Sequence, residues 1–115
     1  MTKPVELNDV NFDKTLQEHS LVMIDFWATD CQPCKVTAPI VEELAEKYNG
    51  KVLIGTVRVD ENPRIVERFG IRAVPTLLVL KDGCEVDRIV LQIIDIVQLI
   101  REYVNEKLEK NAGSA

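Results

Sequence analysis

The chain has 115 residues, 46% of them hydrophobic, which suffices for one core of ordinary size but not for two. Its 14 basic and 19 acidic side chains give a formal net charge of −5 at pH 7, and this balance excludes the basic surface that nucleic acids and anionic membranes require. No segment reaches the ~18 consecutive apolar residues of a membrane span, and the first residues hold no apolar run of signal-peptide length. We therefore expect a cytoplasmic protein whose partners are other proteins.

The chain begins with a predicted strand, helix and strand. The first strand covers 5–7 and the helix covers 10–18, with Asn8 or Asp9 as its cap. The second strand covers 21–27, where the sequence LVMIDFW is mostly apolar and rich in β-formers. Such a run is typical of a strand that is covered on both faces, so we predict it to be the central strand of an α/β protein.

A long helix, a strand and a short helix follow. Apolar residues recur at helical spacing over 34–48, and Gly50 offers a stop just beyond. The next strand is predicted over 52–59. The pair 62–63, Asn-Pro, then provides an N-cap followed by proline at the first helical position, and Gly70 closes this short helix.

The last third of the chain predicts a hairpin and a helix. Two apolar or alternating runs, 76–80 and 85–91, flank Asp82-Gly83, a dipeptide whose residues tolerate the positive φ of a tight turn. The hairpin makes the sheet mixed rather than purely parallel. A final helix over 96–108 carries one apolar stripe, and we expect the tail 111–115 to be frayed.

Two of the three cysteines are spaced Cys-x-x-Cys, at Cys31 and Cys34. A thiol attacks a disulfide only as the thiolate, and the N–H groups at a helix N-terminus stabilise that anion, so Cys31 is the predicted nucleophile and Cys34 the resolving thiol. Pro33 pre-forms the first helical turn, Gln32 completes the loop, and Lys35 adds positive charge nearby. Three cysteines in a reducing compartment favour catalytic or metal-binding use over a structural framework.

Zinc binding is the alternative use of this motif. Cys31, Cys34, Cys84 and His19 would together supply four ligands. No second pair of closely spaced ligands accompanies the first, which favours redox chemistry and no bound metal or other cofactor. Cys84 follows the predicted hairpin turn, and we expect it to be an incidental surface thiol.

Asp25 lies within the predicted central strand, between Ile24 and Phe26. An unpaired carboxylate is costly there, so desolvation should raise its pKa towards the range of a general base that accepts the proton of Cys34. The alternative is an ordinary strand aspartate turned towards water.

Taken together, these residues resemble the thioredoxin family over roughly residues 5–108. The resemblance rests on the order and spacing of several motifs: Asp25-Phe26-Trp27-Ala28, Cys31-x-Pro33-Cys34-Lys35, Ala38-Pro39, Asp60, Asn62-Pro63, Phe69-Gly70-Ile71, Val74-Pro75-Thr76 and Asp82-Gly83. It implies a thioredoxin fold, in which a mixed five-stranded sheet lies between two layers of helices, four in all. We expect residues 1–110 to form this single domain.

The resemblance also implies a docking surface for substrates. Pro75 would be a cis proline facing the sulfur atoms, and the backbone around Val74 would pair with a substrate strand. Trp27 would lie at the surface of the active site. At three positions the chain departs from the family pattern, because Asp30 and Gln32 replace the usual Trp and Gly beside the first cysteine and Leu91 replaces a loop glycine. Thr56 stands where a lysine commonly neighbours the buried aspartate.

The sequence thus predicts a monomeric protein disulfide oxidoreductase that reduces disulfide-containing proteins through Cys31 and Cys34. We expect a thioredoxin reductase to regenerate the dithiol, with its type, NADPH-dependent or ferredoxin-linked, left open. The alternative function is a binding or chaperone module of the same fold with a secondary redox role. Asp30 and Leu91 should narrow the choice of partners, since the first adds a negative charge and the second adds bulk beside Pro75.

Overall fold

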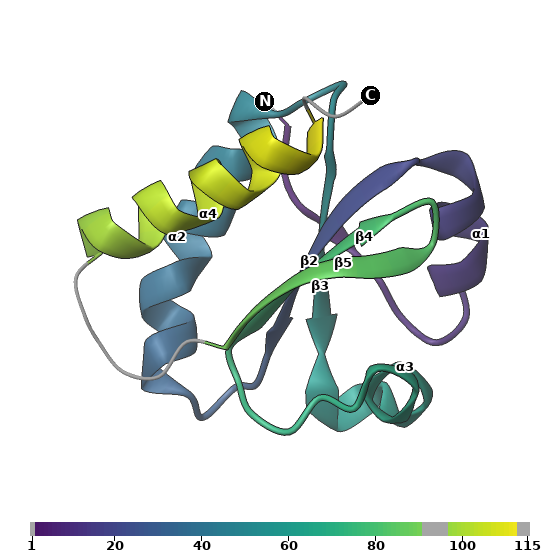
Figure 1. The fold of residues 1–115 in the computed structure, drawn as a ribbon. Coiled ribbons are helices and arrows are strands. Elements are labelled where there is room, and N and C mark those ends of the chain that lie inside the picture. The colour runs from purple at the N-terminus through teal and green to yellow at the C-terminus, as the bar shows by residue number, and fades with distance from the viewer. Residues whose placement is uncertain (1, 91–96, 113–115) are drawn as a thin grey trace.

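A computed structural model describes residues 2–90 and 97–112, and it confirms the predicted order of elements (Figure 1). The strands form one mixed five-stranded sheet in the order β1-β3-β2-β4-β5, with β2 at the centre. β1 and β3 run parallel to their neighbours, whereas β4 is antiparallel to both β2 and β5. The elements are β1 (Val5–Glu6), α1 (Phe12–Glu18), β2 (Leu21–Trp27), α2 (Gln32–Lys47), β3 (Leu53–Arg58), the 3₁₀ turn η1 (Val59–Glu61), α3 (Pro63–Phe69), β4 (Thr76–Lys81), β5 (Cys84–Val90) and α4 (Val97–Ala112).

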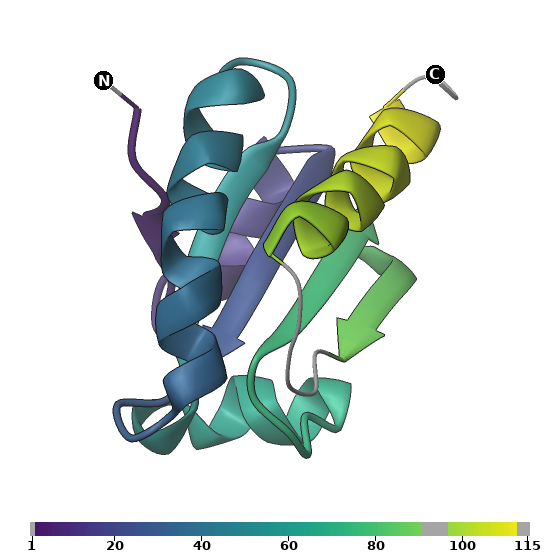
Figure 2. The ribbon, with the colours of Figure 1, turned by 90° about the vertical axis from the view of Figure 1, so that its left-hand side faces the viewer.

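Helices cover the sheet on both faces, as Figures 1 and 2 show. α2 and α4 lie on one face, and their apolar side chains form one core cluster with Met23 and Val79 from the sheet. α1 and α3 lie on the other face, where Phe12 and Ile65 pack in a second cluster with Ile24. The fold is therefore the three-layer α/β/α arrangement that the sequence predicts.

The central strand β2 contributes to both cores because successive side chains of a strand point to opposite faces. Met23 packs beneath α2 and α4, whereas Ile24 and Phe26 pack beneath α1 and α3. This alternation directs Asp25 to the same face as Met23, towards α2. The position is 3% exposed, so the solvated aspartate of the alternative interpretation is not what the structure shows.

The first helix begins at Phe12, two residues later than predicted. Asn8 and Asn11 close a turn in front of it by exchanging bonds: the Asn11 N–H donates to Asn8 Oδ1 at 2.9 Å, and the Asn8 N–H donates to Asn11 Oδ1 at 2.8 Å. The N-cap position of this helix belongs to Asn11, so the prediction that Asn8 or Asp9 caps it is wrong for both residues. Asn8 closes the turn in front of the helix, and the Asp9 carboxylate bonds to a different helix.

Asp9 caps α3 instead. Its carboxylate accepts the N–H groups of Ile65 at 3.0 Å and Arg64 at 3.2 Å. Asn62 occupies the N-cap position of α3, as predicted, but its side chain makes no cap bond and donates to the Arg58 carbonyl. A residue more than fifty positions earlier in the chain therefore supplies the cap.

The predicted hairpin and last helix are present, with shifted ends. Asp82 and Gly83 both have positive φ, 51° and 82°, as a tight two-residue turn requires. α4 continues to Ala112 and so takes up the first two residues of the tail expected to be frayed. There the Asn111 side chain donates to Asp87 on β5 at 3.1 Å.

Candidate functional site

The Cys-x-x-Cys segment lies where β2 ends and α2 begins. Cys31 is the N-cap of α2, and its Sγ accepts the Cys34 N–H at 3.2 Å. Cys31 and Cys34 are joined in a disulfide with their Cα atoms 5.3 Å apart. Both residues are buried, at 8% and 4% exposure. The sulfur of Cys31 thus lies at the positive end of a sixteen-residue helix, which favours a thiolate there.

The residues around the two cysteines start the helix and carry charge. Gln32 and Lys35 are exposed, and Pro33 sits in the first helical turn, where its missing N–H costs nothing. Asp30 is exposed immediately before the helix. The structure therefore confirms that α2 begins at this motif, two residues earlier than the periodicity predicts.

A cis peptide bond joins Val74 and Pro75, as the family resemblance implies. This segment leads into β4, whose first residue, Thr76, pairs with Phe26 of β2. The loop that carries Cys31 leaves β2 one residue after Phe26, at Trp27. The two loops therefore emerge at the same end of the sheet from adjacent strands, with Pro75 buried and Val74 half-buried.

Asp25 reaches a cavity of about 370 Å³ that Cys34 also lines. The remaining walls come from the residue before β1, the end of β2 and the loop after it, α2 and β3: Pro4, Trp27, Ala28, Thr29, Lys35, Ala38, Val41, Glu42 and Thr56. Asp25 Oδ1 is buried and has no hydrogen-bond partner. Desolvation raises the pKa of Asp25 from 3.8 to about 7, which suits a group that exchanges protons at neutral pH.

Thr56 lies directly opposite Asp25 on β3 and lines the same cavity. It therefore occupies the neighbouring position at which the family commonly carries lysine. A threonine hydroxyl is uncharged, so this position does not offset the burial of the carboxylate with a positive charge.

Trp27 is half-buried at the end of β2 and lines both the Asp25 cavity and a second one, of about 360 Å³, that Arg58 also lines. The Arg58 guanidinium lies 5.9 Å from the centre of the Trp27 ring and forms two hydrogen bonds with Asp60, at 2.9 and 3.0 Å. Sequence reasoning missed Arg58. The signal that would have found it is strand register, since Trp27 pairs with Arg58.

The structure separates the four residues of the zinc alternative. Cys84 is free and exposed at the first position of β5, beside the hairpin turn, and His19 is exposed after α1. Cys84 pairs with the last residue of β4, whereas Pro75 directly precedes its first residue, so Cys84 lies at the opposite end of this strand from Pro75. Within residues 2–90 and 97–112, no group of three or more His, Cys, Asp or Glu side chains could hold a metal ion. Leu91, the remaining predicted site residue, lies outside the described residues.

A disulfide at the N-cap of a helix, with a buried carboxyl beside its second cysteine, defines a thiol–disulfide oxidoreductase. The family model "Thioredoxin" matches residues 3–102. The chain is 44% identical to a thioredoxin of Chlorobaculum thiosulfatiphilum over 112 residues, which cover 96% of this chain and 98% of that protein. It is 48% identical to a thioredoxin of Staphylococcus haemolyticus (strain JCSC1435) over 86 residues, covering 75% of this chain and 82% of the relative.

A solved structure agrees with these sequence matches. It is that of a mutant thioredoxin from Halobacterium salinarum NRC-1, which superposes with a TM-score of 0.74 at 28% identity and covers 90% of this chain and 89% of that one. The chain belongs to the thioredoxin family. Its activity is thiol–disulfide exchange, and its substrates as a class are proteins that contain disulfides. Among the helices described, none has the length and apolar character needed to cross a membrane.

Proposed function

We propose that Cys31 is the nucleophile and Cys34 the resolving thiol of a protein-disulfide reductase. In the reduced protein, the Cys31 thiolate attacks one sulfur of a substrate disulfide, and the other substrate sulfur leaves as a thiolate. Cys34, as thiolate, then attacks Cys31 Sγ, releases the second substrate thiolate and forms the disulfide seen here. Two electrons pass from the protein to the substrate. The observation that carries this assignment is the position of Cys31 at the N-cap of α2.

Asp25 is the proton acceptor for Cys34 in this proposal. The two residues line one cavity, which offers a path for a proton between them. Because its pKa is about 7, the carboxyl group is able to accept and return a proton near neutral pH. Asp30, Gln32, Pro33 and Lys35 adjust the site by charge and by fixing the first helical turn.

Substrates dock on the surface formed by Trp27, Val74 and Pro75; Leu91, which the family resemblance adds to this surface, lies outside the described residues. This assignment is supported by the two loops, which leave the adjacent strands β2 and β4 at the same end of the sheet. An extended substrate segment would pair with the backbone at Val74 and present its disulfide to Cys31.

We further propose that residues 1–110 work as a monomeric domain in the cytoplasm. A reducing compartment keeps the dithiol available, and a thioredoxin reductase would regenerate it after each turnover. The competing function is a binding or chaperone module of the same fold in which the redox pair is secondary.

Reduction of insulin by dithiothreitol distinguishes these two functions, because a reductase accelerates the precipitation of the insulin B chain. We expect catalysis by the wild-type protein and none above background by Cys31→Ser. Equal catalysis by Cys31→Ser, or a wild-type protein that only delays precipitation, would contradict the proposal.

A further inference from the structure

The edge strand β5 contains a β-bulge. Leu80 of β4 pairs with Glu85, but its neighbour Val79 pairs with Asp87, so Val86 is an extra residue in the ladder. A bulge of this kind re-aims the side chains on one side of it relative to those on the other.

The bulge brings Glu85 and Arg88 to the same face of the sheet. Residues three apart in a regular strand point to opposite faces, and the extra residue reverses that relation. Glu85 and Arg88 accordingly stand opposite Leu80 and Leu78, which both pack in the core beneath α1 and α3. The Arg88 guanidinium forms two hydrogen bonds with the Glu85 carboxylate, at 2.8 and 2.9 Å.

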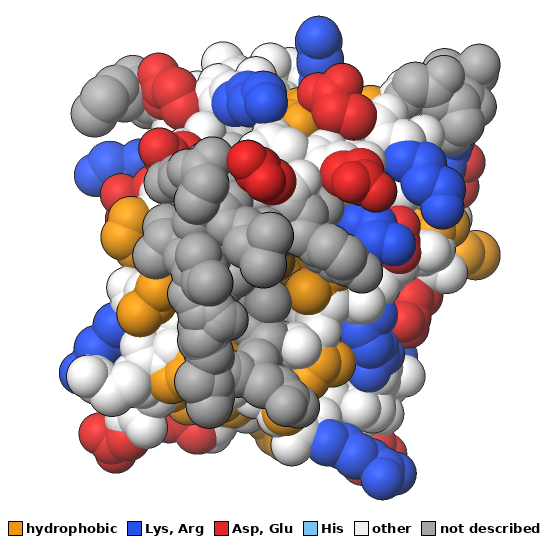
Figure 3. Space-filling view, turned by 60° about the vertical axis from the view of Figure 1, so that its left-hand side comes forward, with side chains coloured by type: hydrophobic (Ala, Val, Ile, Leu, Met, Phe, Trp, Pro, Cys, Tyr) orange, Lys and Arg blue, Asp and Glu red, His pale blue; other side chains and the backbone are white. Residues whose placement is uncertain are grey.

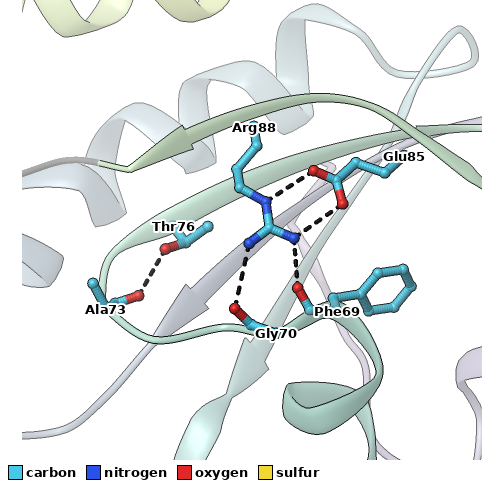
Figure 4. A network of polar contacts seen from close by, with 6 residues as sticks. All are labelled: Phe69, Gly70, Ala73, Thr76, Glu85 and Arg88. Carbon is cyan, nitrogen blue, oxygen red and sulfur yellow. Dashed lines mark hydrogen bonds and ion pairs between the residues drawn. The ribbon is translucent and has the colours of Figure 1, made fainter.

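Arg88 uses its other N–H groups on the end of α3. It donates to the carbonyl of Phe69 at 2.5 Å and to that of Gly70 at 3.4 Å, as Figure 4 shows. Glu85 thus orients the Arg88 guanidinium so that its remaining N–H groups reach the backbone at the end of α3. A planar guanidinium suits this task, whereas the point charge of a lysine does not.

Among the described residues, neither of these two carbonyls accepts a backbone hydrogen bond at the end of the helix. Gly70, with φ of 60°, ends α3 in a left-handed cap: the Gly70 N–H donates to the Glu67 carbonyl at 3.2 Å, and the Ile71 N–H donates to the Val66 carbonyl at 3.0 Å. That pattern satisfies carbonyls within the last turn but not those of Phe69 and Gly70. Arg88 extends the cap to these two carbonyls, and its positive charge opposes the negative end of the helix.

The chain that follows this cap is the loop that carries Val74 and Pro75. Its far end is held by the Thr76 hydroxyl, which donates to the Ala73 carbonyl at 2.7 Å. Figure 4 shows both attachments, Arg88 at the start of the loop and Thr76 at its end. Ile71 packs in the core between them, while Arg72 and Ala73 are exposed.

We propose that Arg88, oriented by Glu85 across the β5 bulge, is a positioning residue that fixes the loop from Gly70 to Pro75 for docking of protein disulfides. The proposal rests on the proposed role of Val74 and Pro75 in substrate binding. A protein substrate would need the loop backbone in a set position, because extended pairing depends on the alignment of several groups. A small disulfide needs only access to Cys31, so Arg88 determines selectivity between the two kinds of substrate.

The test compares two disulfides in single-turnover reactions of the reduced protein. Insulin serves as the protein disulfide and 2-hydroxyethyl disulfide as the small one, with the fluorescence of Trp27, the only tryptophan, as the signal. Arg88→Gln should lower the second-order rate constant for insulin about tenfold, the loss expected for a charge-assisted hydrogen bond. Its rate constant for 2-hydroxyethyl disulfide, and the pH profile of that reaction, should stay within about twofold of wild type.

Two further variants make the comparison decisive. Glu85→Gln keeps the arginine but weakens its orientation, and we expect a smaller fall in the insulin rate constant. Because a partly exposed ion pair contributes little to the free energy of unfolding, we expect Arg88→Gln to fold. If it does not, Glu85→Gln takes its place in the comparison. Arg64→Gln is the matched control, since it removes an exposed arginine charge from the same helix, α3, and it should react normally with both disulfides.

Pro75→Ala separates this inference from the proposed function. If Pro75→Ala slows insulin but Arg88→Gln and Glu85→Gln do not, the docking surface stands and the role of Arg88 is overturned. If none of the three variants slows insulin, the loop is not the docking surface and both proposals fall. If Arg88→Gln lowers the rate constants for insulin and for 2-hydroxyethyl disulfide equally, Arg88 acts on the thiol–disulfide exchange itself, and the inference is overturned as well.

Discussion

Asp25 is a carboxyl group in the most buried strand of the protein, with one oxygen that has no partner. Desolvation favours the protonated form in the folded state and raises the pKa from 3.8 to about 7. Below pH 4 the group is protonated in both the folded and the unfolded chain. Between pH 4 and 7 the unfolded chain loses the proton while the folded protein keeps it, so the free energy of unfolding falls as the pH rises.

Replacing Asp25 by Asn should therefore stabilise the protein in a pH-dependent way. At 1.36 kcal/mol per pKa unit, the gain should reach about 4 kcal/mol above pH 7 and shrink towards zero below pH 4. Urea unfolding of both proteins from pH 3.5 to 8.5 measures this difference. The same variant should slow the second chemical step at pH 7, because the proton acceptor of Cys34 is lost.

Asp60→Asn is the control for this series. Hydrogen bonding with Arg58 lowers the pKa of Asp60, so its contribution to stability has the opposite pH dependence: it is present at neutral pH and lost in acid. A constant difference between wild type and Asp25→Asn across the pH range would show that Asp25 is not buried as a neutral acid.

At the scale of elements, the cap of α3 comes from a distant part of the chain. Asp9 accepts two N–H groups of the first helical turn, and its own N–H donates to Asn62 Oδ1 at 3.0 Å. This contact ties the segment after β1 to the start of α3. It also adds negative charge at the positive end of the helix.

Asp9→Ala should lower the free energy of unfolding by about 1 to 2 kcal/mol, the usual loss for a helix cap. Asp13→Ala is a suitable control, since its carboxylate is exposed and bonds only to the Arg68 side chain among the contacts described. Urea unfolding at pH 7 measures both. If Asp9→Ala were no less stable than Asp13→Ala, the cap would contribute nothing to stability.

The sequence predicts the elements better than the contacts between them. Periodicity and turn residues predict each strand and α-helix described, though not the 3₁₀ turn η1, because those signals lie within a few residues of one another. The sequence predicts Asn62 at the N-cap of α3, and the structure places it there, but a local pattern cannot show that the carboxylate of Asp9 arrives from another segment to accept the N–H groups. In the site, Cys31, Cys34 and Asp25 are visible as a motif and as a charge in an apolar strand, whereas Arg58 and Arg88 depend on strand register and a bulge.

Over the whole molecule, charge acts on the choice of partners rather than on the fold. On the face shown in Figure 3, acidic and basic side chains are interspersed around its edge. Asp30, exposed beside the nucleophile, adds a local negative charge that would repel acidic partner surfaces and favour basic ones.

We therefore expect this protein to be a poor substrate of a standard NADPH-dependent thioredoxin reductase while it remains active on insulin with dithiothreitol. Asp30→Trp combined with Leu91→Gly should improve the coupling, since it removes the charge and restores the family residues. Steady-state NADPH oxidation with a reference reductase measures this. Wild-type kinetics equal to those of an ordinary thioredoxin, or a double variant no better than wild type, would refute the idea.

The division of labour between the two cysteines is tested most directly by trapping the mixed disulfide. In a Cys84→Ser background, which removes the exposed third thiol, reduced Cys34→Ser and Cys31→Ser are mixed with a peptide that contains one disulfide, and the products are weighed by intact-protein mass spectrometry. We predict a stable adduct on Cys31 in Cys34→Ser and little or none in Cys31→Ser, because only Cys31 lies at the helix N-cap. Equal adducts in the two variants, or an adduct on Cys34 alone, would contradict the account.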